Sequence, residues 1–193
     1  IGAEGVSRLL SRLLDAPLVL QRYSRLAYDC NRPPDSPGAM PEMSETTPIP
    51  GNMGLSARDK MARVSAIYWP FHERLARMLD QRACEGRATS LVTIHSFTKM
   101  YKGKEREVEL GILFDRDARI ADRLIKAFPK VDVRLNEPYG PKDGVLHTLN
   151  LHAAPRGLKS AMIEIRNDFI ANERGQNEWA QRLAMPLIHA TTK

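Results

Sequence analysis

Short apolar runs alternate with longer amphipathic segments along most of the chain, and this alternation limits the fold more than any other feature. The runs with the character of strands are 18–21, 90–97, 108–114, 131–135, 145–153 and 160–166. The segments with apolar residues at helical spacing are 5–14, 56–86, 115–128 and about 177–189. Alternating strands and helices are typical of a layered sheet with helices on both faces. The sequence therefore predicts an α/β fold with three α/β/α layers and a mixed central sheet.

Proline and glycine divide the chain at several points. Pro70 is expected to kink or split the helical segment 56–86, which begins at the N-cap residue Ser56. An aspartate is expected to cap the helical segment 115–128. The segment 31–54 is rich in proline and glycine and is predicted to be a long irregular loop. A loop of that length inside a compact domain is often functional.

Length and composition exclude several classes of protein. The 193 residues suffice for one domain with a substantial core. The net charge is +6, but the 29 basic residues are interleaved with 23 acidic ones, which favours a solvated mixed surface over a nucleic-acid-binding face. No apolar run reaches the length of about 18 residues that a membrane span requires. Cys30 and Cys84 form no metal-binding or disulfide pattern. We expect a soluble, cytoplasmic protein that binds neither nucleic acid nor membranes; the sequence does not indicate its oligomeric state.

Polar residues that follow predicted strands are the first candidates for a functional site. In an open α/β sheet, ligands bind outside the carboxyl ends of the strands. This rule selects a small set of residues: Asn31, Arg32, His95, Ser96, Asn136, Glu137, Tyr139, Glu164, Arg166 and Asp168.

His95 ends the apolar run 90–97 and is the most distinctive of the five histidines. A lone histidine at a strand end is most often a hydrogen-bonded core residue, but imidazole is also a common zinc ligand. His72 and His189 lie among charged residues on helical segments and are expected at the surface. His147 and His152 have an odd separation, so on a regular strand they would point to opposite faces and could not serve one site.

Glu164 is the strongest candidate among the carboxylates, because it lies within an apolar run where a charge must be paired or functional. It shares a strand face with Met162 and Arg166. One interpretation is a Glu164–Arg166 pair on a partly exposed edge strand. The other is a general base whose pKa is tuned by burial and by a nearby metal ion or arginine.

Arg25, Asn31 and Arg32 form a second group of interest near the start of the long loop. An arginine fork beside an asparagine amide suits a bidentate carboxylate. Equally, Asp29 and the arginines can simply tie down the loop.

Seven strings occur in order along the chain: YSRLAYDCNRP, SETTPIPGN, TIHSFT, ELGIL, NEPYGPKDG, LHTLNLHA and IEIRNDFI. In this order and spacing they resemble the N-formylglutamate amidohydrolase family over nearly the whole chain. The resemblance implies a phosphorylase/hydrolase-like α/β fold, related to the zinc carboxypeptidases and aspartoacylase. It also implies a cytoplasmic bacterial enzyme of histidine degradation that uses a metal ion to hydrolyse N-formyl-L-glutamate or another small N-acyl amino acid.

The same resemblance assigns roles to the candidate residues. His95 is expected to bind zinc, Glu164 to act as the general base, and Asn31 with Arg32 to hold the substrate carboxylate. Arg25 is expected to assist that clamp. A further group is expected to bind substrate in the pocket: Asn136, Glu137, Tyr139 and Arg166.

The chain departs from the family pattern at its start. The resemblance implies an upstream strand with an HAS-like motif and an aspartate, which together would supply further metal ligands before Ile1. We therefore expect residues 1–193 to form a single domain that lacks its first strand and helix. With His95 alone the zinc site is incomplete, since a catalytic zinc ion needs about three protein ligands. The alternative hypothesis is a non-catalytic family member that binds an acidic amino acid or a protein partner.

Overall fold

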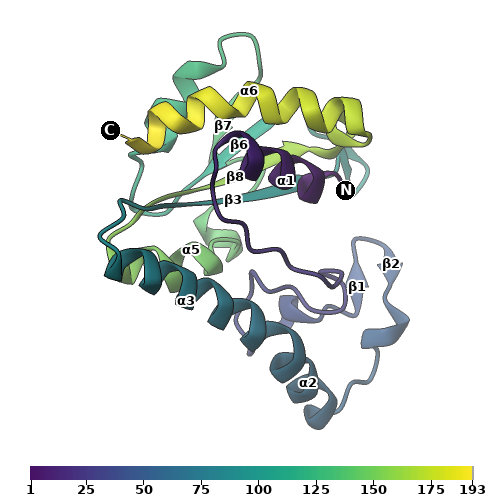
Figure 1. Cartoon of the computed structure of the whole chain (residues 1–193). Coiled ribbons are helices and arrows are strands. Elements are labelled where there is room, and N and C mark those ends of the chain that lie inside the picture. Colours follow the sequence, from purple (N-terminus) through teal and green to yellow (C-terminus); the bar gives the residue numbers. More distant parts are fainter. Residues whose placement is uncertain (193) are drawn as a thin grey trace. The chain divides into compact units, whose positions relative to one another are not determined.

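The chain divides into two compact units, which we describe separately using a computed structural model that describes residues 1–192 (Figure 1). The first unit comprises Ile1–Leu18 and Thr89–Lys193, and the second comprises Val19–Ala88. Among residues 1–192, no helix combines the length and apolar character needed to cross a bilayer.

A four-stranded mixed sheet forms the centre of the first unit. Its strands, in spatial order, are β3 (Ser90–Phe97), β8 (Lys159–Arg166), β6 (Leu110–Leu113) and β7 (Val133–Leu135). β3 and β8 are parallel, β6 is antiparallel to β8, and β7 is parallel to β6. The carboxyl ends of β3 and β8 therefore lie at the same end of the sheet, where β6 begins. The carboxyl ends of β6 and β7 lie at the opposite end.

Helices cover both faces of this sheet, which confirms the predicted three-layer α/β/α fold. α1 (Ala3–Leu13), α4 (Ala121–Leu124) and α6 (Glu173–Thr192) pack on one face. There, Ile163 and Ile165 of β8 join a buried cluster with Val6, Trp179 and Leu183. α5 (His147–His152) lies on the opposite side (Figure 1).

Between β3 and β6 the chain forms a tight hairpin. Its strands are β4 (Met100–Tyr101) and β5 (Lys104–Glu105). Lys102 and Gly103 connect them with positive φ angles of 49° and 75°, as expected for a two-residue hairpin turn. The turn returns the chain to the edge of the sheet where β6 begins.

The second unit consists of the long loop and a helical segment. Its elements are η1 (Pro37–Ala39), β1 (Met43–Ser44), β2 (Thr47–Pro48), η2 (Pro50–Asn52), α2 (Ala57–Arg63), η3 (Val64–Tyr68) and α3 (Trp69–Cys84). The Ser56 hydroxyl accepts a hydrogen bond from the Asp59 N–H at 3.2 Å, so the predicted N-cap is correct. Pro70 falls in the first turn of α3, directly after a π-helical segment, and the backbone stays helical from α2 into α3, so Pro70 does not divide the predicted helix. The Asn52 amide fastens the loop by donating to the carbonyls of Leu26 and Pro41 at 2.7 Å.

Several predictions of secondary structure are wrong. The run 145–153 is helical, because Leu146, Leu149 and His152 repeat every three residues and are buried together. The argument that His147 and His152 occupy opposite strand faces therefore fails. The run 18–21 is irregular, since no strand within residues 1–192 pairs with it.

The predicted helix at 115–128 is much shorter than expected. It comprises α4 followed by η4 (Ile125–Ala127). The residue before α4 is Ile120, so no aspartate caps it. Instead, Asp117 accepts a hydrogen bond from the Arg119 N–H at 3.0 Å, which closes a turn ahead of the helix.

His72 is buried, contrary to the prediction that it lies at the surface. It is 3% exposed on the face of α3 that also carries Leu75 and Leu79. Its Nε2 lies 2.8 Å from the Cys30 carbonyl oxygen. His189 is exposed, as predicted.

Candidate active site

His95 and Glu164 lie side by side on neighbouring strands of the first unit. They are register partners in the parallel pair β3–β8, so both side chains emerge from the same face of the sheet. Glu164 is 4% exposed and His95 is half-buried. Ser96 points to the other face, where its hydroxyl donates to the Ile1 carbonyl at 2.8 Å. The predicted ligand and the predicted base are therefore adjacent.

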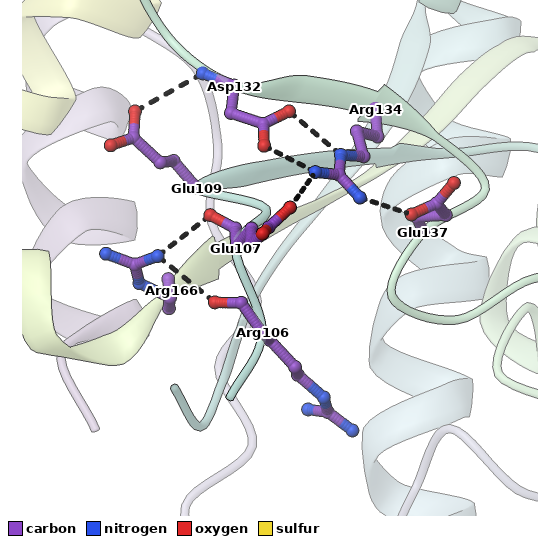
Figure 2. A network of polar contacts seen from close by, with 7 residues as sticks. All are labelled: Arg106, Glu107, Glu109, Asp132, Arg134, Glu137 and Arg166. Carbon is purple, nitrogen blue, oxygen red and sulfur yellow. Dashed lines mark hydrogen bonds and ion pairs between the residues drawn. The ribbon is translucent and has the colours of Figure 1, made fainter. Parts of the chain in front are cut away.

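The alternative interpretation of Glu164 as an edge-strand partner of Arg166 is wrong. β8 is an interior strand between β3 and β6. Arg166 forms its ion pair with Asp168, at 2.9 Å, and its guanidinium stacks 4.4 Å from the Phe169 ring centre. It also donates from Nη1 to the carbonyls of Arg106 and Glu107, at 3.2 and 2.9 Å (Figure 2). Arg166 thus ties the segment before β6 to the end of β8.

Gly111 lies opposite Glu164 on the third strand of this face. A Cβ atom at position 111 would lie 2.1 Å from the carbonyl oxygen of Glu137, so the loop after β7 crosses directly over this glycine. Asn136 fixes that loop by donating from its N–H to the Ile112 carbonyl and accepting from the Phe114 N–H, both at 3.0 Å. The Asn136 carboxamide oxygen therefore has a structural contact in this loop.

Tyr139 reaches the site because this loop folds back across the sheet. β7 runs antiparallel to β3 and β8, so the strand-end rule alone would put Asn136, Glu137 and Tyr139 at the wrong edge. The Tyr139 hydroxyl nevertheless accepts a hydrogen bond from Arg106 Nη1 at 3.0 Å. Burial raises the pKa of Tyr139, the Arg106 hydrogen bond opposes this, and the negative charge of Glu164 raises the pKa further. Tyr139 is therefore a protonated phenol at neutral pH, close enough to Glu164 to respond to its charge.

Arg134 anchors the outer rim of this site. It binds three carboxylates: Asp132 through two bonds at 2.7 and 2.9 Å, Glu107 at 3.1 Å and Glu137 at 3.2 Å (Figure 2). The hydrogen bonds from Arg134 hold the pKa of Asp132 below its ordinary value. The Glu137 carboxylate, predicted to bind substrate, is therefore engaged by Arg134.

Arg25, Asn31 and Arg32 belong to the second unit. Arg25 is exposed, and the other two are half-buried. Asp29 organises the turn, since its carboxylate accepts from the Asn31 N–H at 2.9 Å and its carbonyl accepts from the Arg32 N–H at 3.0 Å. Asp29 thus holds the backbone of the predicted clamp.

The metal-ligand set is incomplete within the described part of the chain. No group of three or more His, Cys, Asp or Glu side chains in residues 1–192 is placed to hold a metal ion. The imidazole of His95 is a suitable donor for zinc, but a catalytic zinc ion needs about three protein ligands. The described residues therefore do not by themselves fit a complete metal centre.

Arg106 and Gly111 also belong to this site, and the sequence patterns did not select either of them. Gly111 left a usable signal, because a glycine inside the apolar run VELGILF marks a close backbone approach. Arg106 left none under the strand-end rule, since the only strand it follows is the two-residue hairpin strand β5, which the sequence did not predict.

Comparison with known proteins identifies the family. The family model described as N-formylglutamate amidohydrolase matches residues 1–171. The chain belongs to the N-formylglutamate amidohydrolase family. This family membership makes it a hydrolase of the N-formylglutamate amidohydrolase kind, acting on a small-molecule substrate.

A solved structure shares the fold of this N-formylglutamate amidohydrolase family member. It is the crystal structure of gene product Atu2144 from Agrobacterium tumefaciens, which is 53% identical and superimposes with a TM-score of 0.95. The match covers 98% of this chain and 76% of the other. A search of curated proteins found no match.

Proposed function

We propose that this protein hydrolyses the N-acyl amide bond of an acidic amino acid, with N-formyl-L-glutamate as the substrate and formate and glutamate as the products. The observation that carries the proposal is the adjacent pair His95–Glu164 on one sheet face, in a chain of the N-formylglutamate amidohydrolase family. A buried carboxylate beside an imidazole is suited to moving protons during attack on an amide.

Glu164 serves as the general base in this proposal. It removes a proton from a water molecule as the water oxygen attacks the carbonyl carbon, and the tetrahedral intermediate then loses the amine when the C–N bond breaks. The proton held by Glu164 passes to the departing nitrogen, so that one water molecule is consumed and no net proton is lost. The protonated hydroxyl of Tyr139 can donate a hydrogen bond to substrate or intermediate.

Three residues of the second unit are proposed to bind the α-carboxylate. Asn31 and Arg32 supply an amide and a planar guanidinium fork, and Arg25 adds a second positive charge. The Asp29 contacts with the backbone of Asn31 and Arg32 support this assignment, because they constrain the turn on which both side chains are mounted.

We also propose that His95 supplies one ligand to a divalent metal ion, with zinc as the preferred metal. A zinc ion lowers the pKa of a bound water molecule to about 7, which is the chemistry it would contribute. None of the proton transfers proposed above depends on the metal. Metal analysis of wild type against His95→Ala tests the assignment: zinc present in wild type and lost from the variant supports it, and equal metal content in both contradicts it.

Replacement of the proposed base tests the reaction itself. Glu164→Gln should lower kcat for N-formyl-L-glutamate by about 100-fold or more, as expected when a general base is removed. Formate release is the measurement. Glu178→Gln is the matched control, because Glu178 pairs with Arg182 on the exposed surface of α6 and should leave the rate unchanged.

Two outcomes would contradict the proposal. Near wild-type turnover in Glu164→Gln would rule out Glu164 as the base. No turnover of any N-acyl amino acid by the wild type, together with saturable binding of glutamate, would favour a non-catalytic amino-acid-binding member of the family.

A further inference from the structure

Arg106 is enclosed by aromatic side chains next to the candidate active site. Its guanidinium carbon lies 4.1 Å from the ring centre of Tyr101, 4.9 Å from that of Tyr139 and 5.7 Å from that of Phe97. Nη1 donates to the Tyr139 hydroxyl at 3.0 Å and to the Thr98 carbonyl at 3.4 Å. These contacts hold a half-buried cation in a defined position.

No carboxylate pairs with this cation in the described part of the chain. Figure 2 makes the contrast plain: Arg134 binds three carboxylates, whereas the side chain of Arg106 points away from that network and only its carbonyl oxygen contacts Arg166. Arg166 likewise has its own acidic partner, Asp168. A guanidinium stays charged at any physiological pH, and removing its charge from water is costly unless an anion compensates.

One edge of the Arg106 guanidinium has no hydrogen-bond acceptor among the described residues. Within residues 1–192, neither Nε nor Nη2 of Arg106 donates a hydrogen bond, and both hydrogen bonds of the group come from Nη1. The Nε–Nη2 edge is one of the two geometries through which arginine binds a carboxylate with two parallel bonds. The aromatic rings contact the group without using these donors.

Arg106 is held near the carboxyl end of the strand that carries His95. Phe97, whose ring centre lies 5.7 Å from the Arg106 guanidinium carbon, follows His95 by two residues on the same strand face. The Cα atoms of two such residues are about 6.6 Å apart. Standard bond lengths give roughly 6 Å between the acyl carbon and the side-chain carboxylate of an extended N-acylglutamate. Tyr139, which accepts a hydrogen bond from Arg106, belongs to the loop whose Glu137 carbonyl lies over Gly111, the register partner of Glu164.

We propose that Arg106 is a specificity-determining residue that binds the side-chain carboxylate of the acidic N-acyl amino acid through its Nε–Nη2 edge. This inference rests on the proposed function and names the group that selects an acidic over a neutral side chain. Tyr101, Tyr139 and Phe97 act as positioning residues for the guanidinium.

The test compares an acidic substrate with its neutral, nearly isosteric counterpart. Arg106→Gln should lower kcat/KM for N-formyl-L-glutamate by about 100-fold, as for loss of one partner of a desolvated charge pair, and change kcat/KM for N-formyl-L-glutamine by less than about 3-fold. Arg106→Lys should retain part of the preference, because it keeps the charge and loses the planar fork. Arg119→Gln is the matched control, since Arg119 pairs with Asp117 at an exposed position.

The ratio of the kcat/KM values for the two substrates distinguishes a role of Arg106 in substrate selection from a purely structural role. Equal losses for both substrates in Arg106→Gln, or an unchanged glutamate-to-glutamine ratio, would overturn it. If the wild type hydrolyses neither substrate, the proposed function fails, and calorimetric binding of L-glutamate and L-glutamine then supplies the readout. A preference for glutamate that Arg106→Gln abolishes would still support the role of Arg106, and equal binding of both amino acids by the wild type would refute it.

Discussion

Replacement of Gly111 by alanine should damage stability and activity together. A Cβ at this position would lie 2.1 Å from the Glu137 carbonyl oxygen and 3.1 Å from Leu113 Cδ1. The obstacle is backbone rather than the end of a flexible side chain, so the loop after β7 must retreat until the first distance reaches at least 3.0 Å. Such a movement strains both hydrogen bonds that Asn136 makes with β6 and its continuation.

The size of the effect follows from these contacts. Overpacking costs about 1–3 kcal/mol, and each weakened loop hydrogen bond adds about 0.5–1.5 kcal/mol. We expect Gly111→Ala to lower the free energy of unfolding by about 3 kcal/mol and Tm by roughly 6–12 °C. Displacement of Tyr139 with the loop should also lower kcat/KM by about 10- to 100-fold.

Thermal unfolding and amide hydrolysis should be measured on the same preparations. Gly51→Ala is the matched control, because no heavy atom lies within 4 Å of the Cβ it would add. At that site alanine should be neutral or stabilise the protein by about 0.4–1 kcal/mol. The reasoning fails if Gly111→Ala unfolds within about 2 °C of wild type and retains full activity.

Two further predictions concern the core of the second unit. Tyr28→Phe should raise the free energy of unfolding by about 1 kcal/mol in urea denaturation, because the fully buried hydroxyl has no hydrogen-bond partner within residues 1–192; destabilisation would mean that the hydroxyl is hydrogen-bonded in solution. Titration of the native protein with an aromatic disulfide near pH 8 should modify Cys84 quickly and Cys30 only after unfolding, since Cys84 is exposed whereas burial raises the pKa of Cys30 to about 12. Rapid modification of both thiols would contradict that burial.

The sequence was sufficient to predict the layered α/β fold and the strands that carry His95 and Glu164, because both strands are long apolar runs. It was misleading for 145–153, where residues spaced as in a helix resembled an alternating strand. Local patterns also carry no information on strand direction. The reversal of β6 and β7 relative to β8 depends on pairing between distant segments, so the route by which Tyr139 reaches Glu164 was not predictable.

β6 runs antiparallel to β8, and this direction places two parts of the candidate site on different elements. Glu164 is mounted on an interior strand that touches the main core on its other face, whereas Arg106 directly follows the β4–β5 hairpin. A change of length or composition in that hairpin would alter the proposed anion-binding edge without moving the strand that carries the proposed base. Under the proposed roles, substrate preference can diverge in evolution through a surface hairpin while the hydrolytic chemistry stays constant.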